Sequence, residues 1–248
     1  MRHWTTPVVG VLGGLGPAAT VTFLDELVRL TDADRDQDHV DAVVLQHSSV
    51  PDRTAAILHG SPSPGPVLAR DAQLLEQMGV DFIVLPCNSA HAFIGDIREG
   101  LSVELLSIVG LAGEQAVETA ASRSGTVGPY TIGVFATEGT IAAQTYEKDL
   151  RGRGARAWIP PGEMQSDLTR IIYDQVKAGR PADVELLGRL VDRALVEGCD
   201  AVLLACTELS IIYAQEEELS ERWEVVDSLE TLAIATIERT GRRVRVSD

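Results

Sequence analysis

The sequence predicts an α/β fold with two similar parallel-sheet domains that are related by pseudo-symmetry. Short runs of β-branched residues alternate with longer segments whose apolar residues recur every three or four positions. This alternation is typical of parallel strands joined by helices, because each parallel crossover needs about a dozen residues or more. The second observation is an internal repeat, since VVGVLGGLGP resembles TIGVFATEGT and DFIVLPCNSAH resembles DAVLLACTELS. The repeat predicts two equivalent units.

The alternation places strands and helices along the whole chain. Strands are predicted at residues 8–12, 42–46, 82–85, 105–108, 131–135, 156–159, 201–204 and 224–226. Helices are predicted between them, among others at residues 18–30, 67–78, 111–121, 139–150 and 182–197. This number of strands is enough for two sheets.

The two repeats run in parallel register. Gly10 precedes Cys87 by 77 positions, and Gly133 precedes Cys206 by 73. Equivalent loops of the two units therefore carry the two cysteines.

The composition of the chain changes near its middle. The Ser/Gly-rich stretch at 122–129 is typical of a turn before the first strand of a second unit. We expect the last strand and helix to cross back to the first unit. The first domain is thus predicted to comprise residues 1–113 with 221–248, and the second domain residues 114–220.

Charge and hydropathy exclude two classes of general partner. The chain has 248 residues, with 37 acidic against 21 basic residues and a formal net charge of −16. Such a protein repels nucleic acid and anionic membranes, so we expect neither as a partner. No apolar stretch is long enough to span a bilayer, and the N-terminal sequence shows no targeting segment. We expect a cytoplasmic protein.

The three cysteines are too few and too scattered for a disulfide framework or a metal site. Cys87 and Cys206 each follow a strand and precede a helical segment. Both thiols are therefore predicted at carboxyl ends of parallel strands, where α/β sheets bind ligands. A helix N-terminus there favours a thiolate, although either cysteine alone could be a core residue. Cys199, in VEGCDAV, is predicted to be structural.

Six motifs in this order resemble the cofactor-independent aspartate/glutamate/hydantoin racemase superfamily, and the aspartate racemase branch most closely. They are GGLGPAAT at 13–20, SVPDRT at 49–54, PCNSAH at 86–91, ATEGT at 136–140, IYDQVKAG at 172–179 and ACTEL at 205–209. The resemblance implies an active site in the cleft between two similar domains, no cofactor or metal, and commonly a homodimer. It also implies that one of the two thiolates, Cys87 or Cys206, removes the α-proton while the other thiol delivers a proton to the opposite face.

Two groups are needed because a single base that returned its proton to the same face would regenerate the starting enantiomer. Charge that builds on the α-carboxylate also needs preorganised donors. Candidate donors flank the cysteines or match family positions that line the carboxylate site, and a glycine turn lets backbone amides approach: Asn88, Ser89, Thr207, Thr137, Gly139, Thr140 and Gly14. For the hydroxyl residues, helix capping is an equally good interpretation.

Four charged or titratable residues complete the predicted site. Arg53 can bind a carboxylate through two nitrogens, and Lys177 supplies a point charge. By resemblance, both match positions that hold the side-chain carboxylate of the substrate. His91 and Glu208, one near each cysteine, could tune the thiols, while capping or packing roles are nearly as good an interpretation. We therefore predict an isomerase that racemises a small acidic amino acid, aspartate first and glutamate second.

Other interpretations remain. Gly14, Gly16 and Ala19 fit a dinucleotide fingerprint after a strand, but the second strand ends in LQHSS without the acidic residue that binds a ribose. Ser89 and Ala205 stand where Thr and Gly are commoner in the family, so glutamate or a related amino acid stays open. Maleate-type isomerases and arylmalonate decarboxylases resemble the same scaffold, and a non-catalytic amino-acid-binding module is a further alternative. The retention of both cysteines favours racemisation.

Overall fold

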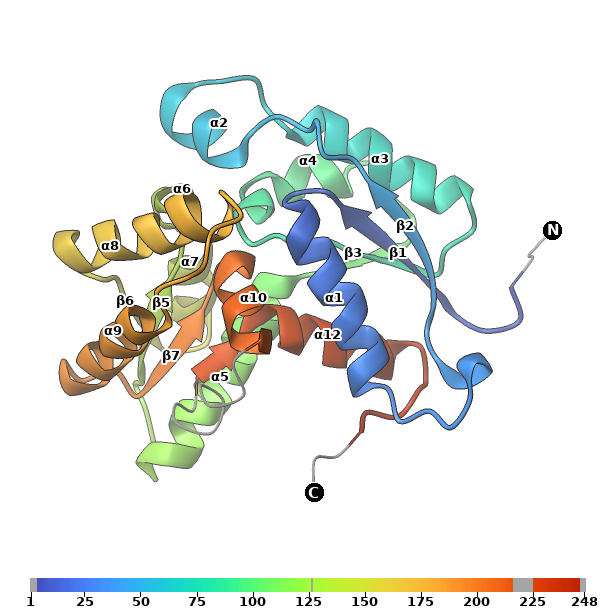
Figure 1. Cartoon of the computed structure of the whole chain (residues 1–248). Helices are drawn as coiled ribbons and strands as arrows, with labels where there is room; N and C mark the ends of the chain where they lie inside the picture. The colour runs from blue at the N-terminus through green and yellow to red at the C-terminus, as the bar shows by residue number, and fades with distance from the viewer. Residues whose placement is uncertain (1–3, 126, 216–224, 246–248) are drawn as a thin grey trace.

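Two four-stranded parallel sheets form the framework of the protein (Figure 1). The computed structural model describes residues 4–125, 127–215 and 225–245. The first sheet has the order β2-β1-β3-β4 and contains β1 (Val8–Gly13), β2 (Asp41–Gln46), β3 (Phe82–Val84) and β4 (Glu104–Leu106). The second has the equivalent order β6-β5-β7-β8 and contains β5 (Thr131–Phe135), β6 (Arg156–Trp158), β7 (Ala201–Leu204) and β8 (Val225–Asp227). The predicted fold class is confirmed.

Helices connect the strands within each sheet. The first half of the molecule, built on β1–β4, contains α1 (Pro17–Leu30), η1 (Asp36–Asp38), α2 (Arg53–His59), α3 (Gly65–Gln77), η2 (Ser89–Phe93) and α4 (Ile94–Arg98). The second half, built on β5–β8, contains α6 (Glu138–Ala143), α7 (Thr145–Gly152), α8 (Gly162–Thr169), η3 (Arg170–Val176), α9 (Val184–Val196) and α10 (Thr207–Gln215). Two further helices, α5 (Ile108–Ser124) and α12 (Ser228–Arg239), follow the last strand of each sheet.

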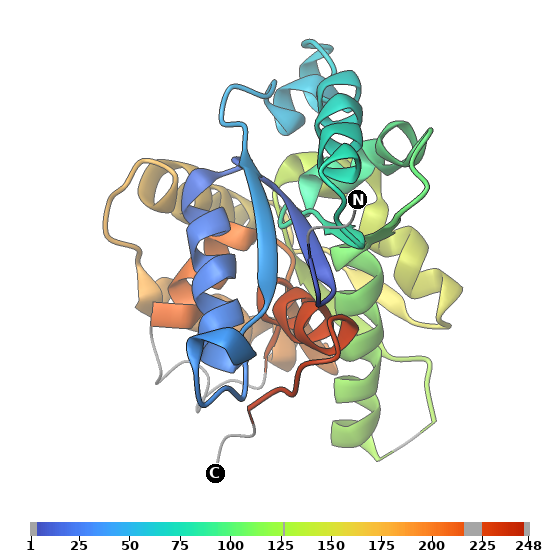
Figure 2. The same cartoon turned by 90° about the vertical axis from the view of Figure 1, so that its right-hand side faces the viewer.

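The helices α5 and α12 cross between the halves. α5 follows β4 but packs on β5, β7 and β8 of the second sheet, whereas α12 follows β8 and packs against α1 of the first half. The two helices also pack against each other (Figure 2). The predicted boundary between residues 113 and 114 falls inside α5, so the chain has no break there.

The strand β8 differs from expectation. It was expected in the first domain, but Val225 pairs with Val202 of β7, so β8 lies in the second sheet. It takes the edge position beside β7 that β4 takes beside β3, which the pseudo-symmetry of the two sheets requires. The predicted boundary between 220 and 221, and residue 224 of the predicted strand, lie outside the described residues. The return to the first half is instead made by α12 and the residues after it, where Val244 forms an isolated bridge with Thr31.

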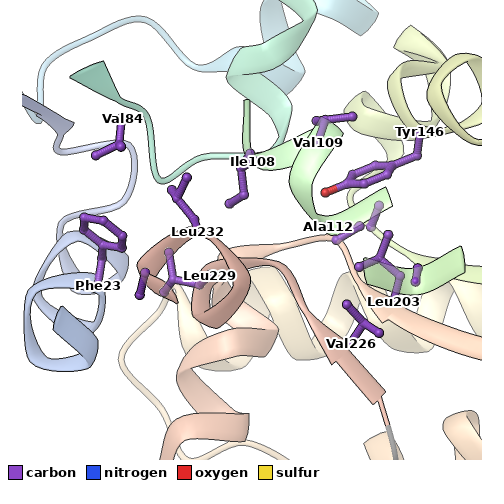
Figure 3. Packing of buried hydrophobic residues seen from close by; sticks show 14 of the residues in the cluster. Phe23, Val84, Ile108, Val109, Ala112, Tyr146, Leu203, Val226, Leu229 and Leu232 are labelled. Carbon is purple, nitrogen blue, oxygen red and sulfur yellow. The ribbon is translucent and has the colours of Figure 1, made fainter. Parts of the chain in front are cut away.

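One apolar cluster joins the two halves (Figure 3). Phe23 of α1, Val84 of β3, Ile108 of α5, Leu203 of β7 and Leu232 of α12 belong to it, and each is fully or almost fully buried. Burying an aliphatic or aromatic side chain of this size contributes about 1.5–3 kcal/mol. The shared core therefore holds the two sheets in a defined relation.

The helix that was predicted at 139–150 is two helices. Gln144, between α6 and α7, has a φ of 55°, in the left-handed region that interrupts a right-handed helix. The interruption turns the chain, so that α6 reaches the site described below while α7 packs on α5.

Candidate active site

The two cysteines of the repeat lie at equivalent places in the two sheets. Cys87 comes three residues after the end of β3, and Cys206 comes two residues after the end of β7. Each side chain is only 4% exposed. The local structures that follow them differ, because Cys206 directly precedes the nine-residue helix α10, whereas Cys87 precedes the five-residue 3₁₀-helix η2. The expected helix N-terminus is thus well formed only at Cys206.

Both thiols line one small cavity between the two halves. Its volume is about 10 Å³, which is room for roughly one water molecule. The first half contributes Leu15, Asp52, Arg53, Thr54, Cys87, Asn88 and Ser89; the second half contributes Thr137, Thr140, Tyr173, Lys177, Ala205, Cys206, Thr207 and Glu208. Residues that are more than a hundred positions apart in the chain thus meet at one point.

Cys206 is held as a thiol by its surroundings. Its Sγ donates a hydrogen bond to Glu208 Oε2 at 3.0 Å. Burial and then the negative charge of Glu208 raise the pKa of Cys206 well above its usual value, although Lys177 acts in the opposite direction. Cys206 is therefore a proton donor in this arrangement.

Glu208 also binds Lys177. The Lys177 Nζ lies 2.8 Å from Glu208 Oε1 and 5.3 Å from the centre of the Tyr173 ring. Burial lowers the pKa of Lys177, but Glu208 and Cys206 outweigh it, so the net shift is upward and the ammonium form is stabilised. Lys177 directly follows the π-helix η3, a widened turn of a kind that is frequent at functional sites. Its charge also acts on both thiols.

Cys87 has a hydroxyl group, not a carboxylate, as the hydrogen-bonding neighbour of its thiol. The Ser89 Oγ lies 3.6 Å from its Sγ, within hydrogen-bonding distance for sulfur. Its carbonyl oxygen accepts a hydrogen bond from His91 Nδ1 at 2.9 Å. Burial lowers the pKa of His91 to about 4, so the imidazole is neutral and its proton is on Nδ1. His91 thus fixes the backbone of Cys87 and does not contact the thiol through an assigned hydrogen bond.

Asn88 ties the Cys87 loop to the second half and to α12. Its Oδ1 accepts a hydrogen bond from the buried Tyr146 hydroxyl of α7 at 2.5 Å, and its Nδ2 donates to Ser228 Oγ at 3.0 Å. These two hydrogen bonds hold Asn88 in one orientation beside the cavity and leave the second Nδ2 hydrogen free to donate.

Arg53 lies in the first turn of α2, which Asp52 caps by accepting from Ala55 N at 2.7 Å. Arg53 as a whole is 9% exposed, and its guanidinium donates to the carbonyl oxygens of Pro51 and Leu15 at 3.3 and 3.1 Å. Within the described residues, its Nε has no hydrogen-bond partner. Arg53, which lines the cavity, therefore has a buried N–H group that can donate a further hydrogen bond.

Among the threonines of the second half, Thr137 has the capping role that was the alternative interpretation. Thr137 caps α6 by accepting from Thr140 N at 3.3 Å, and the two hydroxyls lie 3.0 Å apart. Both residues and Thr207 nevertheless line the cavity, so one set of side chains serves the helix and the site.

Three predicted site residues do not line the cavity. Gly14 has a φ of +96°, and an added Cβ would lie 2.6 Å from the backbone of His47, so it permits a tight turn. Gly139 allows α6 to approach α2, since a Cβ there would lie 2.7 Å from Thr54 Oγ1. His91 faces a different pocket.

The structure adds residues that the sequence interpretation did not single out. Asp52, Thr54 and Tyr173 line the cavity, and the Tyr173 hydroxyl donates to Thr54 Oγ1 at 3.0 Å, which bridges the two halves. All three lie inside the motifs SVPDRT and IYDQVKAG, so these motifs are the sequence feature that could have identified them. Cys199 lies in the apolar core against Gly133, and burial raises its pKa to about 12, in agreement with a structural role.

Metal binding and membrane insertion find no support in the described residues. They contain no group of three or more His, Cys, Asp or Glu side chains placed to hold a metal ion. None of the helices in residues 4–125, 127–215 and 225–245 is long and apolar enough to cross a membrane.

The fold and the site define a class of protein: an α/β protein of two pseudo-symmetric halves with two thiols and two cations around one buried cavity. The family model described as Asp/Glu/Hydantoin racemase matches residues 12–236, and the chain belongs to this family. It is accordingly an isomerase, an amino-acid racemase. The family resemblance of the six motifs is thereby confirmed.

Individual relatives agree with this assignment. The broad specificity amino-acid racemase RacX of Bacillus subtilis (strain 168) is 26% identical over 234 residues, which are 93% of this chain and 96% of that protein. The aspartate racemase of Picrophilus torridus has a TM-score of 0.79 and 29% identity, with 96% of each chain covered. A glutamate racemase of Shewanella loihica is 29% identical over 168 residues, which are 67% of this chain and 59% of that one.

Proposed function

We propose that the protein racemises an acidic amino acid, aspartate first and glutamate second, by proton transfer between Cys87 and Cys206. One observation carries the proposal: a thiol from each half lines the same buried cavity as Arg53 and Lys177. Two thiols supply an acid and a base for the opposite faces of the α-carbon, and two cations suit the side-chain carboxylate of an acidic substrate. The names of the aspartate and glutamate racemases among the relatives support the substrate class.

The protonation of Cys206 assigns the roles of the two thiols. Cys87, as the base, removes the α-proton from one face of the α-carbon. The Cys206 thiol, which burial and Glu208 keep protonated, then donates its proton to the opposite face of the carbanion. The step leaves a Cys87 thiol and a Cys206 thiolate, and the reverse reaction starts from these forms with the roles exchanged.

Glu208 links substrate binding to this proton transfer. In the structure, Glu208 accepts from both the Cys206 thiol and Lys177. A substrate carboxylate that binds Lys177 competes with Glu208 for the ammonium group. Weakening of that ion pair makes Glu208 a stronger hydrogen-bond acceptor for the Cys206 thiol, because Lys177 then shares its positive charge with the substrate.

The α-carboxylate of the substrate is assigned to the neutral donors of the cavity. Amide and hydroxyl groups of Asn88, Ser89, Thr137, Thr140 and Thr207 line it from both halves. Donors fixed by capping and by the Tyr146 hydrogen bond need little reorganisation as negative charge builds. They stabilise the carbanion that forms when the α-proton leaves.

Access requires the cavity to widen, because about 10 Å³ does not hold an amino acid. A neighbouring pocket of about 400 Å³ shares Asp52, Arg53, Lys177 and Glu208 with the cavity. We assign the substrate's path to this pocket, with the Lys177–Glu208 pair at the boundary.

Chiral chromatography tests the substrate class. Each pure enantiomer of aspartate, glutamate and alanine is incubated with the protein, and formation of the opposite enantiomer is followed. An acidic amino acid should invert with a kcat/KM roughly tenfold or more above alanine, because only it has a side-chain carboxylate that can bind Arg53 and Lys177. The similarity to RacX makes broad specificity the second candidate. Equal inversion of alanine would favour it, and no inversion of either acidic amino acid would contradict the proposed substrate.

A further inference from the structure

A second pocket lies between the halves, next to the loop that follows Cys87. Its volume is about 470 Å³, within the range of small-molecule sites. The first half contributes His91, Arg98 and Ser107, and the second half contributes Thr145, Lys148 and Asp149. Across the described residues, none that lines this pocket also lines the two-cysteine cavity. The proposed racemisation gives this pocket no role.

Two buried polar atoms belong to side chains of this pocket. Within the part of the chain that the structure describes, neither His91 Nε2 nor Thr145 Oγ1 has a hydrogen-bond partner. His91 is 5% exposed, and its Nδ1 carries the proton because it donates to the Cys87 carbonyl. The Nε2 atom is therefore a bare acceptor. Buried polar groups are nearly always paired, so these two atoms indicate a missing hydrogen-bonding group.

The pocket is also positively charged. Arg98 and Lys148 line it, and each has donors beyond the one it gives to the carbonyl of Leu105 or Ala143. The 17-residue helix α5 begins at the pocket, so the positive end of its dipole lies there. The one acidic residue of the lining, Asp149, is neutralised by Arg153 at 2.8 Å. In a chain with a net charge of −16, this is a local site for an anion.

We propose that this pocket is a second binding site, for a small oxyanion that also carries an O–H donor. The anion faces Arg98, Lys148 and the start of α5, while the O–H group donates to His91 Nε2. Because the two polar atoms are buried, that group inserts between the halves beneath the surface of the pocket. Occupation then acts on the active site through His91, whose other nitrogen holds the carbonyl of Cys87.

Nitrogen NMR of the histidine rings tests the site directly. The protein labelled with ¹⁵N is titrated with inorganic phosphate and, separately, with glycerate, which distinguish a phosphate from a carboxylate ligand. The Nε2 resonance of His91, assigned by its loss in His91→Gln, should shift and saturate with at least one probe. Propionate, a carboxylate without an O–H group, should leave it unshifted. If neither phosphate nor glycerate moves this resonance, or if propionate moves it equally, the proposal is overturned.

Charge variants separate this pocket from general anion binding. Arg98→Gln with Lys148→Gln should raise the Kd of the active probe by about tenfold or more, since two charge-assisted contacts are lost. Arg151→Gln removes an exposed cation from the same helix, α7, at a position outside the pocket lining, and should leave the Kd unchanged. An equal effect of the Arg151→Gln control, or unchanged binding in the double variant, would contradict the site. Circular dichroism verifies that each variant is folded.

Discussion

The Cys206 thiol donates a hydrogen bond to the same carboxylate, Glu208, that binds Lys177 on its other oxygen. The buried thiol, the buried carboxylate and the partly exposed ammonium group are thus linked in series at the edge of the cavity. A change of charge at Lys177 therefore alters the proton affinity of Cys206, and a change at Cys206 alters that of Lys177. The first prediction follows from this coupling.

Glu208→Gln should lower the pKa of Cys206, because the variant keeps the shape of the side chain and removes the negative charge that raises this pKa. Alkylation of Cys206 by iodoacetamide should therefore begin at lower pH than in the wild type. Tandem mass spectrometry, which localises the label within a peptide, measures the rate at Cys206 separately from Cys87 and from Cys199, seven positions away. An unchanged or upward-shifted pH profile would contradict the assigned role of Glu208.

Arg53→Gln should weaken the binding of diacids selectively. Loss of a charge-assisted hydrogen bond to a carboxylate costs about 1.5–3 kcal/mol, or roughly ten- to a hundredfold in KM. Steady-state kinetics with aspartate should show this rise, while a neutral amino acid that is turned over should be affected much less. Arg53→Lys, which keeps the charge, is the matched control and should lie between Arg53→Gln and the wild type. Equal losses for acidic and neutral substrates would exclude a side-chain carboxylate role.

Tyr146→Phe should destabilise the protein and reduce its turnover. The variant removes the hydroxyl that donates to Asn88 at 2.5 Å and leaves a buried amide oxygen unpaired, at a cost of about 1–3 kcal/mol. Urea unfolding measures the stability, and kcat reports the position of Asn88 beside Cys87. Tyr130→Phe, an aromatic substitution remote from the cavity lining, is the control for kcat. A Tyr146→Phe variant with wild-type stability and turnover would show that the hydrogen bond does not position Asn88.

Asp227→Asn should change how stability depends on pH. Burial raises the pKa of Asp227 from its usual 3.8 to about 7. In the window from about pH 4 to about pH 7 the folded protein keeps a proton that the unfolded chain has lost, so the wild-type free energy of unfolding falls as pH rises. The asparagine, which still caps α12 through its oxygen, does not titrate. The difference in free energy of unfolding, variant minus wild type, should grow by about 4 kcal/mol across this window.

Urea unfolding at a series of pH values measures that difference. His91 acts on the wild-type free energy of unfolding in the opposite direction. Its pKa is lowered from 6.5 to about 4 in the folded protein, so this free energy falls as the pH drops from about 6.5 towards 4. The difference between Asp227→Asn and the wild type cancels this contribution. A difference that is constant with pH would contradict the raised pKa.

The sequence predicted the parts of the fold that repeat. Both β1 and β5 are apolar runs in the same place in each unit, and the strand order of the two sheets is identical. The two cysteines were found because the repeat places them at equivalent strand ends. By contrast, the partner of β8 depends on which sheet edge is free, and a three-residue strand carries no such information.

The site could be predicted only where motif and chemistry agree. Arg53 and Lys177 reach the cavity as expected, but Gly14 and Gly139 serve close backbone approaches that depend on His47 and Thr54 from distant segments. The hydrogen bond from Tyr173 to Thr54 joins residues that are 119 positions apart, so no local sequence pattern predicts it. Long-range packing, which sequence periodicity does not describe, decides these contacts.

Deuterium exchange at the α-carbon tests the two-thiol account most directly. Each enantiomer of aspartate is incubated in heavy water with the wild type, Cys87→Ser or Cys206→Ser, and both deuterium content and chirality are measured. The wild type should yield the opposite enantiomer with one α-deuterium. Each serine variant should invert about 10²- to 10⁴-fold more slowly, and a variant that still exchanges should do so from one enantiomer with retention. Inversion at the wild-type rate in either variant would contradict the account.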